Sequence, residues 1–320
     1  MRGRPFVSGA PGRSCPLSYR YGPSALSTKT DFQVETLWVA GGLYGNAFAL
    51  ERLLDLYERE PGRKALVFNG DFHWFDVEQS DFKRIGDAVL GYFATRGNVE
   101  TELARPQDGA GCGCAYPDWV DEGTVSRSNR IIEKLRATAR AFPLALERLA
   151  ALPMHLAAQV GGERIAIVHG DAASLAGWGF SQECLSTSEG RAAAARNFND
   201  SNVKIFASSH TCLPVLQCFP GERVIANNGA AGMPNFRGTS FGLATRISVR
   251  ASKNSIYGSK AGDSYVEAVP LDYDAAAWQR RFVAQWPAGS DAHRSYYERI
   301  ADGPRYSLQQ ALRREAALAA

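Results

Sequence analysis

Several features are missing from this sequence, and each absence narrows the class of protein. No apolar run approaches the length of a membrane-spanning helix, so we expect no membrane association. The 36 Lys and Arg residues are scattered and balanced by 33 Asp and Glu, so we expect no nucleic-acid track. The six cysteines lack regular framework spacing, and residues 1–15 lack a signal peptide's apolar core. We therefore expect a cytoplasmic protein with reduced thiols.

The composition is that of a globular protein with a full-sized core: 320 residues, 45% hydrophobic and 22% charged. Residues 1–34 are rich in Gly, Pro, Ser and Arg and predict an N-terminal arm. Residues 35–273 predict the main domain, and residues 274–320 predict a charged, helical C-terminal extension. The oligomeric state is not indicated by any pattern in the sequence.

Strands and helices alternate in the first half of the main domain, and strands dominate its second half. Apolar runs predict strands at residues 35–40, 64–68, 92–95, 154–160, 164–168, 203–207, 215–219, 223–226, 241–249 and 265–271. Amphipathic runs predict helices at residues 47–58, 78–90, 128–141, 144–152, 190–197 and 275–286. Residues 101–125 predict a long loop, which in a compact domain is usually functional. The pattern indicates an α/β fold of two packed mixed sheets with helices outside.

Polar residues follow several of the predicted strands. At four of these strand ends, one of the polar side chains is suited to bind a metal. In residues 64–76, a buried strand ends and delivers Asp71. Asn98, His169 and His210 follow later strands in the same way. Ligands bind at the carboxyl edge of open α/β sheets, and this set of nitrogen and oxygen atoms suits Mn, Fe or Zn. These four residues are therefore the predicted metal ligands.

Each of these strand ends also has a simpler interpretation. Asp71 could cap a helix, Asn98 could be a turn residue, and either His could be a satisfied structural residue. The turn at residues 41–42 could present backbone N–H groups to an anion at the start of the next helix. The candidate anion-binding residues there are Gly42, Gly45 and Asn46.

The segments at these strand ends, taken in their order along the sequence, resemble the motifs of the calcineurin-like metallophosphoesterase family. The family's motifs run Asp-x-His, Gly-Asp-x-x-Asp, Gly-Asn-His-Asp/Glu, a strand-terminal His and Gly-His-x-His. The matching segments here are Gly42-Leu43-Tyr44-Gly45-Asn46, Gly70-Asp71, Gly97-Asn98-Val99-Glu100, Val168-His169-Gly170-Asp171 and Ser209-His210-Thr211-Cys212. Residues 227–232 resemble the family's late Asn-x-Gly-Ser turn. The resemblance covers residues 35–249 and implies a four-layer α/β/β/α sandwich.

The resemblance also implies two metal sites that share one carboxylate. One site would be held by Asp71, Asn98, His169 and His210, which are all of ligand type. The positions that match the other site are Gly42, Tyr44, Asp71 and Cys212, so two ligands are lost and a thiol replaces an imidazole. We therefore expect one intact site for a divalent metal ion (Mn, Fe or Zn), with Cys212 as an additional candidate ligand.

The activity implied by the resemblance is hydrolysis of a small-molecule phosphate monoester or diester, in which a metal-bound hydroxide attacks phosphorus. The family's His after the Asn, which acts on the leaving group, is Val99 here, and valine cannot transfer a proton. His73, Tyr44 and Cys212 lie near strand ends and are the candidate replacements. The alternative is an inactive protein of the same fold that binds a metal or a phosphate ligand for a regulatory role.

Cys112 and Cys114 fall in the predicted long loop. A Cys-x-Cys pair can bind a soft metal, and Cys15 and Cys212 would complete such a set only if the arm and the loop folded over the site. The simpler interpretation is a pair of ordinary loop thiols. The segment at residues 73–75 (His-Trp-Phe) is expected to form a lid or wall of the site, since no basic groove accompanies it.

Overall fold

Two mixed β-sheets form the centre of the structure, a computed structural model that describes residues 10–313. The six-stranded sheet has the order β11 (Tyr257–Ala261), β12 (Ser264–Leu271), β10 (Gly242–Ser248), β2 (Thr36–Ala40), β3 (Lys64–Asn69) and β4 (Phe93–Thr95). The seven-stranded sheet has the order β1 (Phe32–Val34), β5 (His155–Val160), β6 (Glu163–Val168), β7 (Ile205–Ser208), β9 (Arg223–Asn227), β8 (Val215–Phe219) and β13 (Leu312–Arg313).

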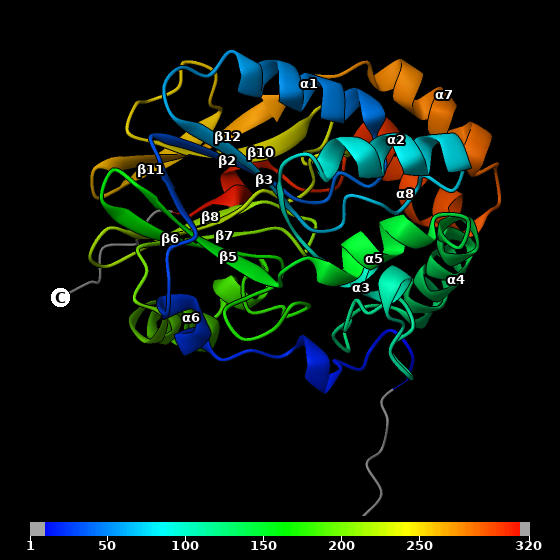
Figure 1. The fold of residues 1–320 in the computed structure, drawn as a ribbon, viewed down its shortest axis with the longest axis horizontal. Coiled ribbons are helices and arrows are strands. Elements are labelled where there is room, and N and C mark those ends of the chain that lie inside the picture. Colours follow the sequence, from blue (N-terminus) through cyan, green and yellow to red (C-terminus); the bar gives the residue numbers. More distant parts are fainter. Residues whose placement is uncertain (1–9, 314–320) are drawn as a thin grey trace, which may run out of the picture.

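Helices cover the outer faces of both sheets (Figure 1). The helices α1 (Ala47–Glu58), α2 (Gln79–Val89) and α7 (Ala275–Gln285) lie over the six-stranded sheet, and α6 (Ser188–Ser201) lies on the far side of the seven-stranded sheet. Further α-helices are α3 (Asn98–Ala104), α4 (Glu122–Ala139), α5 (Pro143–Ala151), α8 (Asp291–Asp302) and α9 (Leu308–Ala311). The predicted four-layer α/β/β/α sandwich is confirmed. Within residues 10–313, no helix combines the length and the apolar character needed to cross a bilayer.

The alternation of side chains along the strands explains the layers. In β2, Leu37 and Val39 belong to the apolar layer between the two sheets, which they share with Ile165 and Ile167 of β6. Trp38, between them in sequence, belongs to the core under α1 and α2. Successive side chains of a strand point to opposite faces, so one short apolar strand contributes to both layers.

Parallel pairing places several strand ends at a common edge. β2 pairs in parallel with β3, and β3 pairs in parallel with β4, where Asn69 lies opposite Thr95. In the other sheet, β6 pairs in parallel with β7, and β7 with β9. The carboxyl ends of parallel strands lie at one edge of their sheet, which is where open α/β sheets bind ligands.

The structure departs from the sequence-based expectation in several segments, of which three concern the arm, the predicted loop and the C-terminal segment. Residues 32–34, expected in the arm, form β1 and pair with β5. The segment expected as a loop from residue 101 begins inside α3, because Glu100 in the first turn of this helix accepts a hydrogen bond from the Gly97 N–H. The C-terminal segment, expected to be helical, includes β13, which pairs with β8. Pairing with distant strands decides both β1 and β13, and local sequence patterns do not show it.

Asn69, the last residue of β3, ties the two sheets together beside the strand ends. Its buried side-chain amide donates to the Val168 carbonyl of β6 at 2.7 Å, and its side-chain oxygen accepts from the Thr95 hydroxyl at 3.0 Å. Its backbone carbonyl accepts from Oγ of Ser209 at 2.9 Å and lies 2.8 Å from Nδ1 of His169. One residue of the six-stranded sheet therefore sets the spacing to two strands of the other sheet.

Replacing Asn69 with alanine should lower the free energy of unfolding by about 2–3 kcal/mol, because the buried Val168 carbonyl loses this donor and the Thr95 hydroxyl loses its acceptor. Urea denaturation followed by circular dichroism measures the change. The matched control is Asn254→Ala at an exposed position, which should alter the free energy of unfolding by less than about 0.5 kcal/mol. Equal effects of the two substitutions would show that Asn69 does not tie the sheets together.

Candidate metal centre

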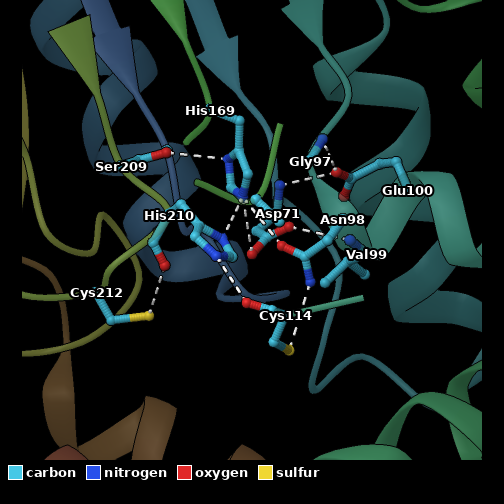
Figure 2. Close-up of polar contacts among 12 residues, drawn as sticks. Asp71, Gly97, Asn98, Val99, Glu100, Cys114, His169, Ser209, His210 and Cys212 are labelled. Atoms are coloured by element: carbon cyan, nitrogen blue, oxygen red, sulfur yellow. Dashed lines mark hydrogen bonds and ion pairs between the residues drawn. The ribbon is translucent and has the colours of Figure 1, made fainter. Parts of the chain in front are cut away.

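Four side chains from four strand ends meet in one place (Figure 2). Asp71 lies two residues beyond β3, and Asn98 is the first residue of α3 after β4. His169 directly follows β6, and His210 lies two residues beyond β7. All four residues are buried. The structure thus brings together all four residues that the sequence predicted as ligands of the intact metal site.

Nε2 of His169 is the central atom of the group. It lies 3.3 Å from Oδ2 of Asp71, 3.2 Å from Oδ1 of Asn98 and 3.2 Å from Nδ1 of His210. Four ligand atoms around a tetrahedral cation, each at about 2.1 Å, are roughly 3.4 Å apart, so the observed separations suit such an ion. Within residues 10–313, one group of at least three His, Cys, Asp or Glu side chains is close enough to hold a metal, and it consists of Asp71, His169 and His210.

Main-chain carbonyl groups orient both imidazole rings. Nδ1 of His169 lies 2.8 Å from the Asn69 carbonyl oxygen, and Nε2 of His210 lies 3.0 Å from the Cys114 carbonyl oxygen. Because a carbonyl only accepts, these nitrogens carry the hydrogen, and the other ring nitrogens direct lone pairs to the centre. The Asn98 amide donates to the main chain as well, which turns its oxygen inward. Together with the Asp71 carboxylate, this set of atoms fits a divalent cation.

The pKa values of the three titratable groups reflect this crowding. Burial opposes a charge on Asp71, but His169 outweighs it and holds the pKa of the carboxyl below its usual range. Burial also opposes a charge on His169, but the Asp71 carboxylate outweighs it and raises the pKa of the imidazole. Burial and the neighbouring His169 lower the pKa of His210 to about 4. Asp71 and His169 can share a proton, and this proton competes with a metal cation for the same lone pairs.

Glu100 holds the turn that carries Asp71 (Figure 2). Its fully buried carboxylate accepts from the backbone N–H groups of Asp71 at 2.8 Å, Phe72 at 3.0 Å and Gly97 at 2.8 Å. Burial and the Asp71 charge raise the pKa of Glu100. Asp71 has a φ of 53°, in the left-handed region that Asp tolerates better than most residues. A Cβ atom on Gly97 would lie 2.2 Å from Oδ1 of Asp71, so glycine is required there.

The sequence-based prediction gave Glu100 no role of its own. The available signal was its place three residues after Gly97, because an acidic side chain in the third position of a helix often bonds back to the N-cap backbone. Its additional contacts to Asp71 and Phe72 come from a different strand end, and no local pattern shows them.

The residues at the positions of the second implied metal site contact one another. The Tyr44 hydroxyl lies 2.9 Å from Sγ of Cys212. A Cβ atom on Gly42 would lie 2.8 Å from the Tyr44 ring, so the ring uses the space that a side chain at position 42 would need. Arg299 donates to the Cys212 carbonyl at 2.7 Å. A phenol hydroxyl and a thiol therefore contact each other at two positions where the resemblance implies metal ligands.

A narrow cavity of about 40 Å³ opens onto the ligand cluster. Its walls include three of the predicted ligands, Asp71, Asn98 and His210, together with Val99. The other wall residues are two thiols and five aromatic side chains: Cys114, Cys212, Tyr44, Trp74, Tyr116, Trp178 and Tyr296. Pockets that enclose a whole small molecule measure about 300–1,000 Å³, so this cavity holds only the head group of a ligand.

His73 and its neighbour Trp74 face different surroundings. His73 is buried away from the cavity wall, with Nδ1 2.6 Å from Oδ2 of Asp76 and its ring stacked on Phe82 at 4.1 Å between centroids. Trp74 does line the cavity, as expected for a wall of the site. Of the three candidate catalytic replacements, Tyr44 and Cys212 reach the cavity and His73 does not.

The predicted anion-binding residues use their polar groups inside the fold. The N–H groups of Gly42 and Gly45 were expected to face an anion, but they donate to the carbonyls of Gly70 at 3.1 Å and Phe72 at 2.8 Å. The Asn46 side chain accepts from the first N–H groups of α1, and its amide donates to a main-chain carbonyl at 2.9 Å. These donors already have partners, because the turn packs directly on the end of β3.

Cys112 and Cys114 are buried residues of the loop at residues 105–121, and both are free thiols. The Cys114 N–H donates to Sγ of Cys112 at 3.4 Å, and the Asn98 amide lies 3.6 Å from Sγ of Cys114. Cys15, in the arm, contacts Ser174 instead. Among residues 10–313, no thiol joins a group of three or more potential metal ligands.

Replacing Glu100 with glutamine should lower the free energy of unfolding by about 3 kcal/mol and weaken Mn²⁺ binding at least tenfold. The glutamine amide would face backbone N–H groups that need an acceptor, and the Asp71 turn would lose its support. Urea denaturation and calorimetric titration with MnCl₂ measure the two effects. Glu133→Gln, whose side chain is 62% exposed, is the matched control. Unchanged Mn²⁺ affinity in the Glu100 variant would exclude a positioning role.

Comparisons with known proteins identify the fold. No family model and no curated protein match the sequence. The structure is similar to a metallophosphoesterase from Sphaerobacter thermophilus, with a TM-score of 0.55, 16% identity, and coverage of 85% of this chain and 100% of that chain. It is also similar to a hypothetical protein from Pyrococcus horikoshii OT3, with a TM-score of 0.57, 14% identity, and coverage of 86% and 100%. The chain has the calcineurin-like metallophosphoesterase fold that its motifs predicted.

Proposed function

We propose that the protein is a metal-dependent phosphoesterase that hydrolyses a small-molecule phosphate monoester or diester. The observation that carries the proposal is the convergence of four lone-pair atoms, each oriented by its neighbours, at the floor of an open cavity. A divalent cation held there, such as Mn, Fe or Zn, supplies a Lewis acid for phosphate oxygens and lowers the pKa of water. The metallophosphoesterase fold supports this assignment.

The groups around the cavity suggest how the reaction is completed. The oxygen of a water molecule forms a bond to phosphorus as the ester P–O bond breaks, and the departing alkoxide takes up the proton that the water releases. Val99 in the cavity wall cannot transfer that proton. We assign to the Tyr44 hydroxyl the hydrogen bond to the departing oxygen, with Sγ of Cys212 as its other partner. A hydroxyl in this place steadies the departing group without a second cation.

A second candidate function is metal or phosphate binding without turnover. The contact between Tyr44 and Cys212 favours it, because these side chains fill the positions that match a second metal site. Without a second cation, less positive charge is available to neutralise the phosphate as it reacts. In that case the single site would hold a metal or a phosphate group for a regulatory role.

Metal-stripped protein should bind one Mn²⁺ per chain in a calorimetric titration, and the loaded protein should hydrolyse p-nitrophenyl phosphate or bis(p-nitrophenyl) phosphate. His169→Ala removes the central ligand atom and should reduce both binding and hydrolysis at least a hundredfold. His293→Ala, on α8 and stacked on Tyr297, is the matched control and should retain both. Binding of Mn²⁺ without hydrolysis of either ester would favour the second candidate. Full hydrolysis by the His169 variant would refute this site.

The combined substitution of Gly42→Asp, Tyr44→His and Cys212→His should raise the Mn²⁺ stoichiometry from one to two. Gly42→Asp alone should leave it at one, because the Tyr44 ring would remain 2.8 Å from the new Cβ atom. Calorimetry and elemental analysis both measure the stoichiometry. A single ion bound by the triple variant would show that these positions do not correspond to a second site.

A further inference from the structure

An exposed tryptophan stands beside the cavity. Trp119 is 61% exposed, and its ring meets the ring of Trp178 edge to face, with 6.2 Å between centroids. Trp178 lies 5.5 Å from the His210 ring and 6.0 Å from the Tyr116 ring. A row of aromatic rings therefore runs from a predicted metal ligand outward to the solvent. Exposed apolar surface next to a site is typical of a binding surface.

Hydrogen bonds fix this row of rings in position. The Trp178 indole N–H donates at 3.0 Å to the Cys114 carbonyl, which is the same group that orients His210. The loop that carries Trp119 is bound by Arg13, which donates to two of its carbonyl groups at 2.7 Å each. The rings therefore present a prepared surface, and a ligand that contacts them loses little additional entropy in ordering the protein.

The cavity gives little help to a poor leaving group. Val99 has no proton to donate, and the only imidazole among the described residues that line the cavity is that of His210, a predicted metal ligand. An aliphatic alcohol is about as weak an acid as water, whose pKa is about 15.7, so the alkoxide needs a proton as the P–O bond breaks. A phenol is a stronger acid, so the phenolate departs more readily as the anion. The small volume of the cavity, about 40 Å³, also places any group beyond the phosphate outside it, along the aromatic rings.

We infer that Trp119, Trp178 and Tyr116 form a subsite for an aromatic ring borne directly on the ester oxygen, so the substrates are phosphate esters of phenols. The inference rests on the proposed function, because the subsite is defined by its position next to the metal ligands. The phosphate lies in the cavity, and the ring packs against the row of aromatic side chains. Trp119 contributes its exposed face to this contact.

The test compares binding of two phosphonates that cannot be hydrolysed, because an aryl ester would also react faster merely through its better leaving group. Calorimetry on Mn²⁺-loaded protein should show phenylphosphonate binding at least tenfold more tightly than methylphosphonate. Trp119→Ala should weaken phenylphosphonate binding about tenfold and leave methylphosphonate binding unchanged, and Trp119→Phe should restore the preference. Leu144→Ala, at another exposed apolar position, is the matched control and should leave both affinities unchanged.

The outcomes separate this inference from the proposed function. A Trp119-dependent preference for phenylphosphonate in a protein that hydrolyses no ester would support the subsite and refute the hydrolase. Hydrolysis combined with equal affinity for the two phosphonates would support the hydrolase and overturn the subsite. A Trp119-dependent gain shown only by a nucleoside 5′-monophosphate would also overturn the assignment to phenol esters.

Discussion

Each ligand side chain of the centre is held from its far side, and the whole site depends on this constraint. The outer nitrogens of His169 and His210 face main-chain carbonyl groups, so their inner nitrogens must direct lone pairs toward one another. Buried acceptors brought together without a donor are unfavourable unless a proton or a cation lies between them. The fold maintains the arrangement because Asn69 connects the two sheets and Glu100 supports the Asp71 turn. The centre is therefore prepared by residues that do not belong to it.

The ligand set was predictable, because each member lies within three residues of the end of a strand and strand direction limits where its side chain can lie. Asp71, Asn98 and His169 illustrate this, since each follows the end of a short apolar run by one to a few residues. The supporting contacts were not predictable in the same way. The Cys114 carbonyl that orients His210 belongs to a loop without periodicity, and its position depends on tertiary packing. Strand β1 was missed for the same reason, because only its pairing with β5 defines it.

The changes at the second site depend on one another sterically. The Tyr44 ring lies where a side chain at position 42 would extend, so the present position of this ring requires glycine at position 42. Cys212 completes the arrangement, because its sulfur lies next to the Tyr44 hydroxyl. A loss of ligands by random substitution would leave open space or unpaired polar groups. Here the replacements pack and bond with one another, so the described side chains fill the positions that match the second site.

Part of the cavity wall, Cys114 and Tyr116, belongs to a loop whose structure was hard to predict, and the N-terminal arm supports this region. In the arm, the Tyr19 hydroxyl donates to Glu102 of α3 at 2.5 Å, and Arg13 binds the carbonyl groups of the loop that carries Trp119. The arm therefore does not lie passively on the domain, since it fixes a loop that faces the cavity. Metal ligands at strand ends are determined by the fold, whereas a surface built from an arm and a loop can change without disturbing either sheet. For this reason the ligand cluster follows from the motifs, whereas the surface around Trp119 has to be derived from its contacts in the structure.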